Sequence, residues 1–105
     1  MDRKEIIKKL KEFRDKLGRR VSIEKIIFFG SRANGKPNKD SDIDLIIVSK
    51  DFRGKKFRYR ALEFYDYWNL DYPVDFLCYT PEEFNKLKKQ ITLVNEAVKK
   101  GIEIK

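Results

Sequence analysis

Residues 26–48 read IIFFGSRANGKPNKDSDIDLIIV, and this stretch decides the fold. It begins and ends with apolar runs that are typical of buried strands. The first run stops abruptly at Gly30 and Ser31, and the second is entered through two aspartates, Asp42 and Asp44. The pattern predicts a strand, a tight turn with a short helix or loop, and a second strand. Small polar groups and two carboxylates would then lie at one end of a sheet, where a phosphate and a metal can meet, and we interpret this end as the candidate active site.

Gly30 and Ser31 allow two interpretations. Glycine suits a chain that turns at once from strand to helix, and serine is a natural N-cap, so a structural function explains an isolated Gly-Ser pair. In the functional interpretation, free amides at the helix start and the Ser31 hydroxyl hold a phosphate. Arg32, Lys36 and Lys39 add positive charge around the loop that follows.

The aspartates suggest a cation site. Side chains two apart on a strand share a face, so Asp42 and Asp44 project together, roughly 7 Å apart along the chain. Like charges at this distance favour solvent or a cation between them, and a hydrophilic strand start is the alternative. Asp75 lies inside an apolar run, residues 74–79, where a carboxylate is costly unless it is paired or metal-bound. If the two strands are neighbours, Asp75 completes a three-carboxylate cluster; a salt bridge to a nearby Arg or Lys is the other explanation.

Composition narrows the chemistry. The sequence contains no histidine, so a metal would be bound by oxygen, which points to magnesium or manganese rather than zinc. A net charge of +8 favours polyanionic partners such as nucleotides, nucleic acid or an acidic protein, although interleaved acidic residues fit a solvated charged surface equally well. The single cysteine, Cys78, excludes an internal disulfide framework, and we expect a cytoplasmic protein. No apolar run approaches a membrane span, so no membrane partner is expected.

The remaining pattern predicts a single domain, residues 1–105, of the α+β (α/β) class. Helical spacing of apolar residues predicts helices over residues 2–17 and 57–68 and from Thr80 to Gly101, with Thr92 as a point where the last helix can break in two. Alternating or apolar runs predict strands over residues 22–29, 42–49 and 74–79, with a short edge strand over residues 102–104.

The combined motifs resemble the minimal nucleotidyltransferases of the polymerase beta superfamily. These proteins carry Gly-Ser-x-Ala-Arg-Gly followed by Ser-Asp-x-Asp-Leu at this spacing. The matching positions are Gly30, Ser31, Ala33, Gly35, Ser41, Asp42, Asp44 and Leu45. Residues 74–77 are similar to the strand that carries the third carboxylate. One departure is visible, because Asn34 stands where the family often has Arg.

The resemblance implies a polymerase beta-like fold, a small mixed sheet flanked by helices. It also implies that Asp42, Asp44 and Asp75 are catalytic and bind two Mg²⁺ ions, with Mn²⁺ as an alternative. The nucleotide and its phosphates, with ATP as the substrate, would be bound by Gly30, Ser31, Arg32 and Ser41. Members of this kind are commonly encoded beside a HEPN-domain protein and act as its antitoxin, in some cases by transferring AMP to a tyrosine of that toxin.

Three hypotheses of function follow. The first is an enzyme that transfers a nucleoside monophosphate, AMP from ATP, to a hydroxyl, with a tyrosine of a HEPN toxin as the acceptor. The second is an antitoxin subunit that neutralises its partner by contact, without catalysis. The third, favoured least, is a small nucleic-acid-binding protein, which predicts strongly salt-dependent binding. Formation of a homo-oligomer stays open.

Overall fold

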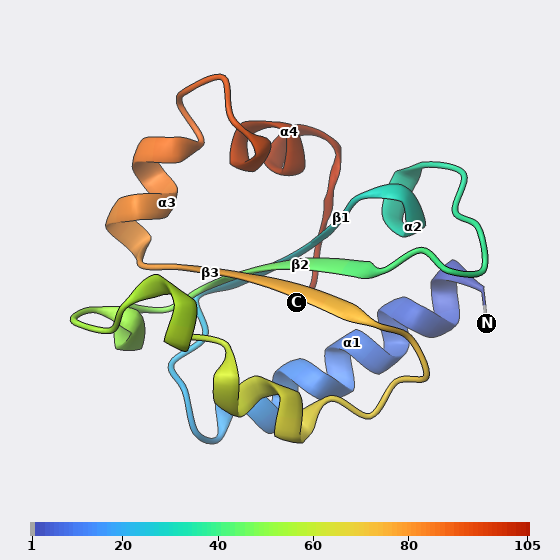
Figure 1. The fold of residues 1–105 in the computed structure, drawn as a ribbon, viewed down its shortest axis with the longest axis horizontal. Coiled ribbons are helices and arrows are strands. Elements are labelled where there is room, and N and C mark those ends of the chain that lie inside the picture. Colours follow the sequence, from blue (N-terminus) through green and yellow to red (C-terminus); the bar gives the residue numbers. More distant parts are fainter. Residues whose placement is uncertain (1) are drawn as a thin grey trace.

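The computed structural model describes residues 2–105 and has one four-stranded sheet with helices on both faces (Figure 1). This confirms the predicted α+β class and mixed sheet. The strands are β1 (Lys25–Phe29), β2 (Ile43–Val48), β3 (Val74–Tyr79) and β4 (Ile102–Glu103). The α-helices are α1 (Arg3–Gly18), α2 (Ser31–Asn34), α3 (Pro81–Leu87) and α4 (Leu93–Lys100), and the 3-10 helices are η1 (Lys50–Phe52), η2 (Phe57–Tyr59) and η3 (Leu62–Tyr67).

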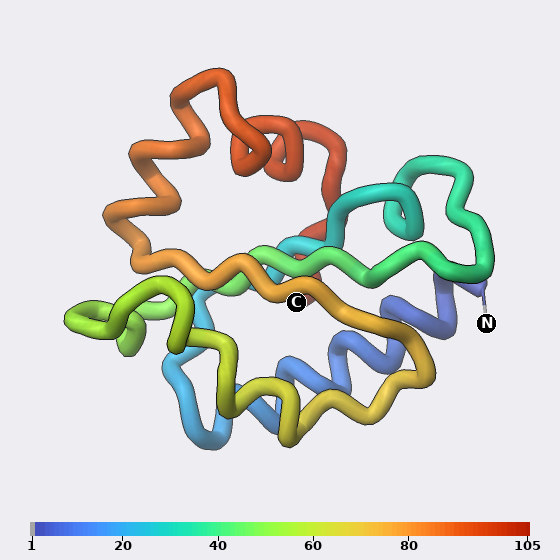
Figure 2. Tube along the Cα trace, in the orientation of Figure 1, coloured from blue at the N-terminus to red at the C-terminus, as the bar shows by residue number. Residues whose placement is uncertain are grey.

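The sheet order is β3-β2-β1-β4. Strand β1 is antiparallel to both β2 and β4, whereas β2 and β3 are parallel. A parallel neighbour needs a crossover connection, and the chain between β2 and β3 supplies it on the same side of the sheet as α1 (Figure 2). The crossover brings the N-terminal ends of β2 and β3 together, next to the C-terminal end of β1.

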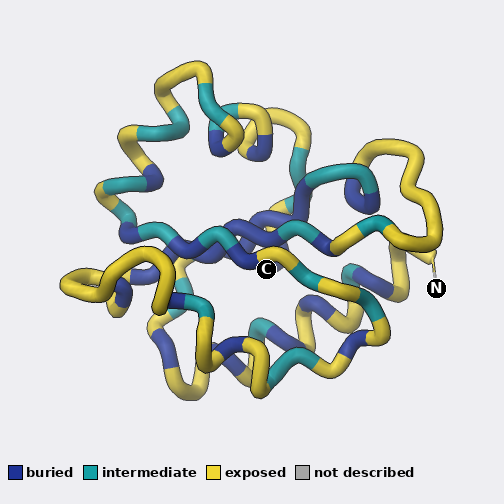
Figure 3. Tube along the Cα trace, in the orientation of Figure 1, coloured by how far each residue is buried: buried dark blue, intermediate teal, exposed yellow. Residues whose placement is uncertain are grey.

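The core lies on both faces of the sheet, and side chains alternate between them as the sequence predicts. Ile43, Leu45 and Ile47 pack with α1 and the crossover, whereas Ile46 and Val48 pack with α3 and α4. The central strands are therefore buried along most of their length (Figure 3). Asp44 is two residues before Ile46, so it belongs to the face that α3 and α4 cover.

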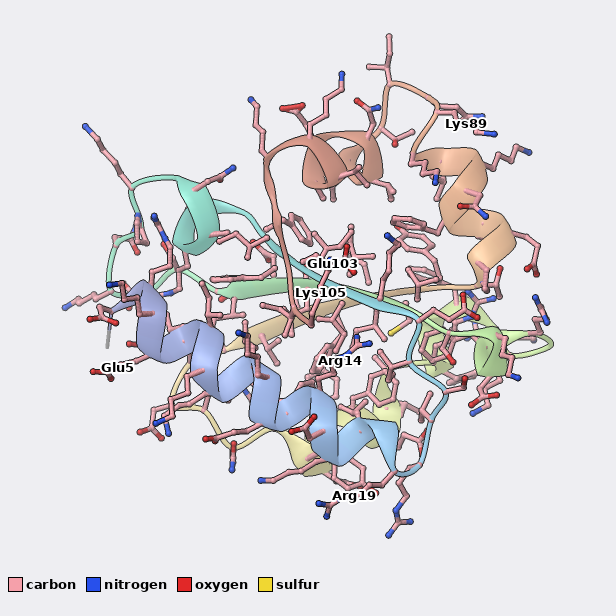
Figure 4. All side chains as sticks on the ribbon, turned by 180° about the vertical axis from the view of Figure 1, so that it is seen from behind. Glu5, Arg14, Arg19, Lys89, Glu103 and Lys105 are labelled. Atoms are coloured by element: carbon pink, nitrogen blue, oxygen red, sulfur yellow. The ribbon has the colours of Figure 1, made fainter. Side chains whose placement is uncertain are left out.

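Helix α1 forms where its apolar spacing predicts it. The Asp2 carboxylate accepts a hydrogen bond from the Glu5 amide at 2.9 Å and caps the first turn. The buried side chains are Ile6, Leu10, Phe13 and Leu17. Charged side chains such as Glu5 and Arg19 are exposed on the outer surface (Figure 4), which matches the interpretation of much of the charge as solvated surface.

The prediction of a long helix over residues 57–68 is wrong, because this segment forms only the short 3-10 helices η2 and η3. Its aromatic residues are at helical spacing, but they pack individually against residues of β3. Phe57 contacts Tyr79 at 5.5 Å between ring centroids, and Phe64 and Trp68 both contact Phe76 at 5.8 Å. These tertiary contacts outweigh the weak preference for a continuous helix.

The C-terminal part follows its capping signals. Thr80 and Glu83 form a complete capping box at the start of α3. Thr92 accepts a hydrogen bond from the Asn95 amide and begins α4, so the predicted break into two helices is confirmed. The expected edge strand is also present, as β4.

Candidate active site

Asp44 and Asp75 are direct neighbours across the parallel pair of β2 and β3. Their Cα atoms are partners in the register, and adjacent strands lie about 4.8 Å apart. Side chains at paired positions of a parallel sheet lie on the same face, so both carboxylates are on the side of α3 and α4. Asp44 is half-buried and Asp75 is exposed. The structure thus brings together two acidic residues that are far apart in the sequence.

Gly30 lies against the carboxylate of Asp44, at the end of β1, which is the neighbour of β2 on the side away from β3. Phe29 at the end of β1 pairs with Asp44, and Gly30 follows with a φ of +83°, a conformation that residues with a side chain rarely adopt. A Cβ on Gly30 would lie 3.2 Å from Asp44 Cγ and closer still to Oδ2. Glycine is therefore required here by both the backbone conformation and the close approach of Asp44.

The electrostatics of the site favour a cation. The pKa of Asp44 is raised from its ordinary value of 3.8, first by partial burial and then by the negative charges of Asp75 and Asp42. Asp42 is exposed and precedes β2 by one residue. Asp75 and Asp42 thus both act on Asp44 with like charge, and carboxylate oxygens suit Mg²⁺ or Mn²⁺.

The carboxylates do not form a finished metal site. Across residues 2–105, no group of three or more acidic or cysteine side chains has the geometry to hold a metal ion. The four ion pairs in this part of the chain do not include Asp75, so the structure gives no support to the alternative of a salt bridge at that residue. What is present is a cluster of neighbouring carboxylates whose donor atoms fit a hard divalent cation.

The turn after Gly30 leads directly into α2. Ser31 is its first residue, and the first amides of a helix have no partner within the helix. The Gly30 carbonyl accepts hydrogen bonds from the amides of Ala33 and Asn34, which closes the short helix. Gly30 and Ser31 therefore have the arrangement that the sequence predicts, a tight turn with amides at the end of β1.

The side chains of Arg32 and Ser41 make hydrogen bonds to other residues of the protein. Arg32 is 9% exposed, and its guanidinium donates to the carbonyls of Asn38, Lys39 and Ser41. The Ser41 hydroxyl accepts a hydrogen bond from the Asn38 amide at 3.0 Å. The sequence predicts phosphate contacts for both residues, whereas these hydrogen bonds favour a function in organising the loop before Asp42.

Asn34, the one visible departure from the motif that the sequence resembles, connects α2 to α4. Its side-chain amide donates to the carbonyl of Lys100 at 2.8 Å. A cavity of about 190 Å³ lies beside the turn, and it is lined by Phe29, Gly30, Asn34, Leu93, Glu96, Ala97, Lys100 and Gly101. Sequence reasoning missed this cavity, because it depends on how α4 folds back onto the end of β1.

Comparison with known proteins assigns the family. The family described as "Nucleotidyltransferase domain" matches residues 7–100, nearly the whole chain. The chain belongs to this family. The prediction of a nucleotidyltransferase enzyme is therefore confirmed.

The proteins similar to this chain include one relative known by sequence and two solved structures. The nucleotidyltransferase is 34% identical over 77 residues to "Probable protein adenylyltransferase MntA" of Haemophilus influenzae, across 71% of this chain and 68% of the relative. A crystal structure of a presumed nucleotidyltransferase from Sulfolobus solfataricus has a TM-score of 0.68 at 20% identity, over 96% of this chain and 80% of the other. This similarity shows the fold, which is polymerase beta-like. A second solved structure, also described as a presumed nucleotidyltransferase, is 31% identical with a TM-score of 0.47, over 78% of this chain and 86% of the other.

The helices of the nucleotidyltransferase are short or amphipathic. Among the described residues, none of them combines the length and the apolar character that a membrane crossing requires.

Proposed function

We propose that this nucleotidyltransferase transfers AMP from ATP to a hydroxyl group of a partner protein, in a reaction that depends on Mg²⁺. The proposed acceptor is a tyrosine of a HEPN-domain toxin, so that the transfer makes the enzyme an antitoxin. The proposal includes a cytoplasmic location, where ATP and such a partner are available.

The pairing of Asp44 with Asp75, beside the turn at Gly30, is the observation that carries the proposal. Transfer of a nucleotidyl group needs negative charge to collect where metal ions can bridge the phosphates, and it needs amides that donate to the phosphate oxygens. This end of the sheet offers both within one small region. The absence of histidine is consistent with a reaction that uses no imidazole base.

Asp42, Asp44 and Asp75 would hold the metal. When bound, Mg²⁺ supplies charge neutralisation and alignment of the triphosphate for in-line attack by the acceptor hydroxyl, with pyrophosphate as the leaving group. The carboxylates would set the position of that charge, and the repulsion of Asp44 by Asp75 and Asp42 supports a bound cation there. Mn²⁺ would occupy the same oxygen ligands.

Gly30 and Ser31 would bind the triphosphate. The amides at the start of α2 point away from the helix and can donate to phosphate oxygens, and the Ser31 hydroxyl adds another donor. Glycine at position 30 leaves the space in which Asp44 and the phosphates approach each other. The cavity beside the turn offers additional room for the nucleotide.

The partner and acceptor rest on similarity. The relative named as a protein adenylyltransferase covers 71% of this chain at 34% identity, and this supports a protein as the acceptor of AMP. Exposed apolar side chains, among them Phe57, Tyr59, Leu62 and Tyr65, offer surface for contact with a partner. The same surface would serve an antitoxin that acts by contact without catalysis.

The experiment is incubation with ATP labelled on the α-phosphate, Mg²⁺ and the HEPN-domain partner. We expect label on the partner with the wild-type enzyme and none with Asp42→Asn or Asp44→Asn. Asp40→Asn is the control, because this exposed carboxylate precedes the site by only two residues and adjoins the same loop. Neutralisation of the toxin without label transfer would favour the contact mechanism and contradict the proposed activity.

A further inference from the structure

The guanidinium of Arg32 contacts two of the segments that converge on the candidate site, and its own backbone belongs to the third. Arg32 itself follows the Gly30-Ser31 turn. Its Nε donates to the Ser41 carbonyl at 2.6 Å, directly before Asp42, and its Nη2 donates to the carbonyls of Asn38 and Lys39 at 3.1 and 3.3 Å.

The guanidinium of Arg32 also contacts the segment before β3, through the ring of Tyr72. The guanidinium carbon lies 4.3 Å from the centre of the Tyr72 ring, a cation–π geometry. Tyr72 is followed by Pro73, whose carbonyl accepts a hydrogen bond from the Ile43 amide at 2.9 Å, between Asp42 and Asp44. The ring contact therefore connects Arg32 to the chain that carries Asp75 into the sheet.

The nature of these partners distinguishes Arg32 from an ordinary structural arginine. Within residues 2–105 its side chain is in none of the ion pairs, although it is 9% exposed. The other strongly buried arginine, Arg60, pairs with the Glu83 carboxylate at 2.6 Å and donates to the carbonyls of Lys55 and Cys78. Arg32 is thus held only by backbone carbonyls and an aromatic face, with no carboxylate among the hydrogen-bond partners of its guanidinium in residues 2–105.

We propose that Arg32 is a positioning residue of the nucleotidyl-transfer site. It fixes the separation between the phosphate-binding turn, the loop that delivers Asp42 and Asp44, and the segment that delivers Asp75. The inference rests on the proposed function, since it assumes that these three segments act together. It assigns to Arg32 a function other than direct contact with phosphate.

The planar fork of arginine is essential to this arrangement. Two different nitrogens donate to separate carbonyls of one loop, Nε to Ser41 and Nη2 to Asn38, while the guanidinium carbon lies 4.3 Å from the centre of the Tyr72 ring. A lysine at position 32 has a single nitrogen and no flat face, so it keeps the charge but loses the geometry. Arg32→Lys therefore separates the charge of the residue from its positioning function.

The test compares Arg32→Lys with Arg60→Lys as the matched control, because both are buried arginines that donate to backbone carbonyls and Arg60 lies at the opposite end of β3. The first readout is amide hydrogen exchange without metal or nucleotide. We expect the Ser41 and Ile43 amides, which donate to Asn38 and Pro73, to lose about tenfold or more of their protection only in Arg32→Lys.

The second readout is transfer to the partner per folded molecule. We expect kcat to fall about ten- to a hundredfold in Arg32→Lys and the Mg²⁺ concentration for half-maximal rate to rise, with KM for ATP changed much less, because a small misplacement of catalytic groups costs this much. Arg60→Lys should lower the unfolding temperature and leave kcat and the Mg²⁺ requirement unchanged.

The positioning function of Arg32 and the proposed transfer activity can be contradicted independently of each other. Unchanged protection at Ser41 and Ile43 in a folded Arg32→Lys, or an unchanged kcat and Mg²⁺ requirement, would overturn the positioning function. If Arg32→Lys does not fold, the test uses Tyr72→Leu, which removes the ring under the guanidinium. This variant must show a smaller loss of amide protection at Ser41 and Ile43 and a smaller change in kcat and Mg²⁺ requirement. The absence of both changes overturns the inference. A wild-type enzyme with no transfer contradicts the proposed function, whereas the exchange readout still tests Arg32.

Discussion

Gly30 and Asp44 are packed so closely that no side chain fits between them. A Cβ at position 30 would lie 3.2 Å from Asp44 Cγ, and the backbone there has a φ of +83°. The turn that would bind phosphate is therefore built in direct contact with a carboxylate that would bind metal. The antiparallel pairing of Phe29 with Asp44 explains why the two motifs, separated by a loop in the sequence, lie together in one region of the structure.

Gly30→Ala should abolish nucleotidyl transfer and destabilise the protein by about 2–4 kcal/mol, because it combines a strained backbone with a clash. Gly54→Ala is the matched control, since Gly54 has a φ of +81° and a Cβ added there would meet nothing within 4 Å. It should cost about 1 kcal/mol and leave transfer intact. Urea unfolding and the label-transfer assay measure both effects, and full activity of Gly30→Ala would contradict the close packing.

Asp44→Asn should inactivate the enzyme and at the same time stabilise the metal-free protein at neutral pH. Replacing the carboxylate removes a partly buried charge and its repulsion with Asp75 and Asp42. The gain should be on the order of 0.5 kcal/mol, a small value because Asp44 is partly exposed and screened by solvent. Thermal unfolding without metal is the measurement, and a lower midpoint for Asp44→Asn than for wild type would count against the repulsion.

The pH dependence of that gain has a defined sign. The fold raises the pKa of Asp44 above its ordinary value of 3.8, so between the unfolded and folded pKa values the folded state binds more protons. Stability from this residue is then lost as pH rises through the folded pKa. The difference between Asp44→Asn and wild type should grow from acid to neutral pH. Mg²⁺ should reduce the difference by stabilising wild type alone.

Cys78 should be unreactive toward thiol reagents in the folded protein. It is 2% exposed, and burial raises the pKa of its thiol to about 12, with the charge of Arg60 opposing the shift. The thiolate that reacts is therefore almost absent at neutral pH. Modification by a chromogenic disulfide should follow the rate of unfolding, and it should be immediate in denaturant. Rapid labelling of native protein would show that the end of β3 opens.

Glu83→Gln should destabilise the protein by about 1 kcal/mol, a value reduced for the solvent exposure of Glu83. Its carboxylate binds the buried Arg60 and completes the capping box of α3, and glutamine keeps only part of both interactions. Glu82→Gln is the control, because its pair with Arg53 is solvent-exposed on both sides and should have no measurable effect on stability. Equal unfolding midpoints for the two variants would contradict a special function of Glu83.

Much of the fold could be predicted because local signals and tertiary structure agree. The capping residues Thr80 and Thr92 marked the starts of α3 and α4, and alternation separated Asp44 from the Ile43, Leu45 and Ile47 face of β2, although Asp42 lies one residue before the strand. The segment over residues 57–68 could not be predicted, because its aromatic spacing looks helical while the contacts of Phe57 and Phe64 with β3 impose 3-10 turns. Local periodicity gives no information about such partners.

The candidate site was predicted less completely than the fold. Motif spacing predicted Asp42, Asp44 and the Gly-Ser turn as site candidates, because these residues are close in sequence, whereas the place of Asp75 depended on strand pairing. The position of Arg32 depends on a loop and on Tyr72, which is distant in the chain, so no local pattern indicated that its guanidinium would be buried. The charge of Arg32 was evident from the sequence, whereas its hydrogen-bond partners required the structure.

Binding of Mn²⁺ with a non-hydrolysable ATP analogue, followed by electron paramagnetic resonance, tests the central claim most directly. The claim is that Asp42, Asp44 and Asp75 form one metal–nucleotide site with the turn at Gly30. We expect wild type and Asp40→Asn to bind Mn²⁺ equally, and Asp44→Asn and Asp75→Asn each to weaken binding at least about tenfold. Unchanged Mn²⁺ binding by Asp75→Asn would contradict the claim, because the carboxylate brought to Asp44 by the parallel strand pairing would then have no part in the site.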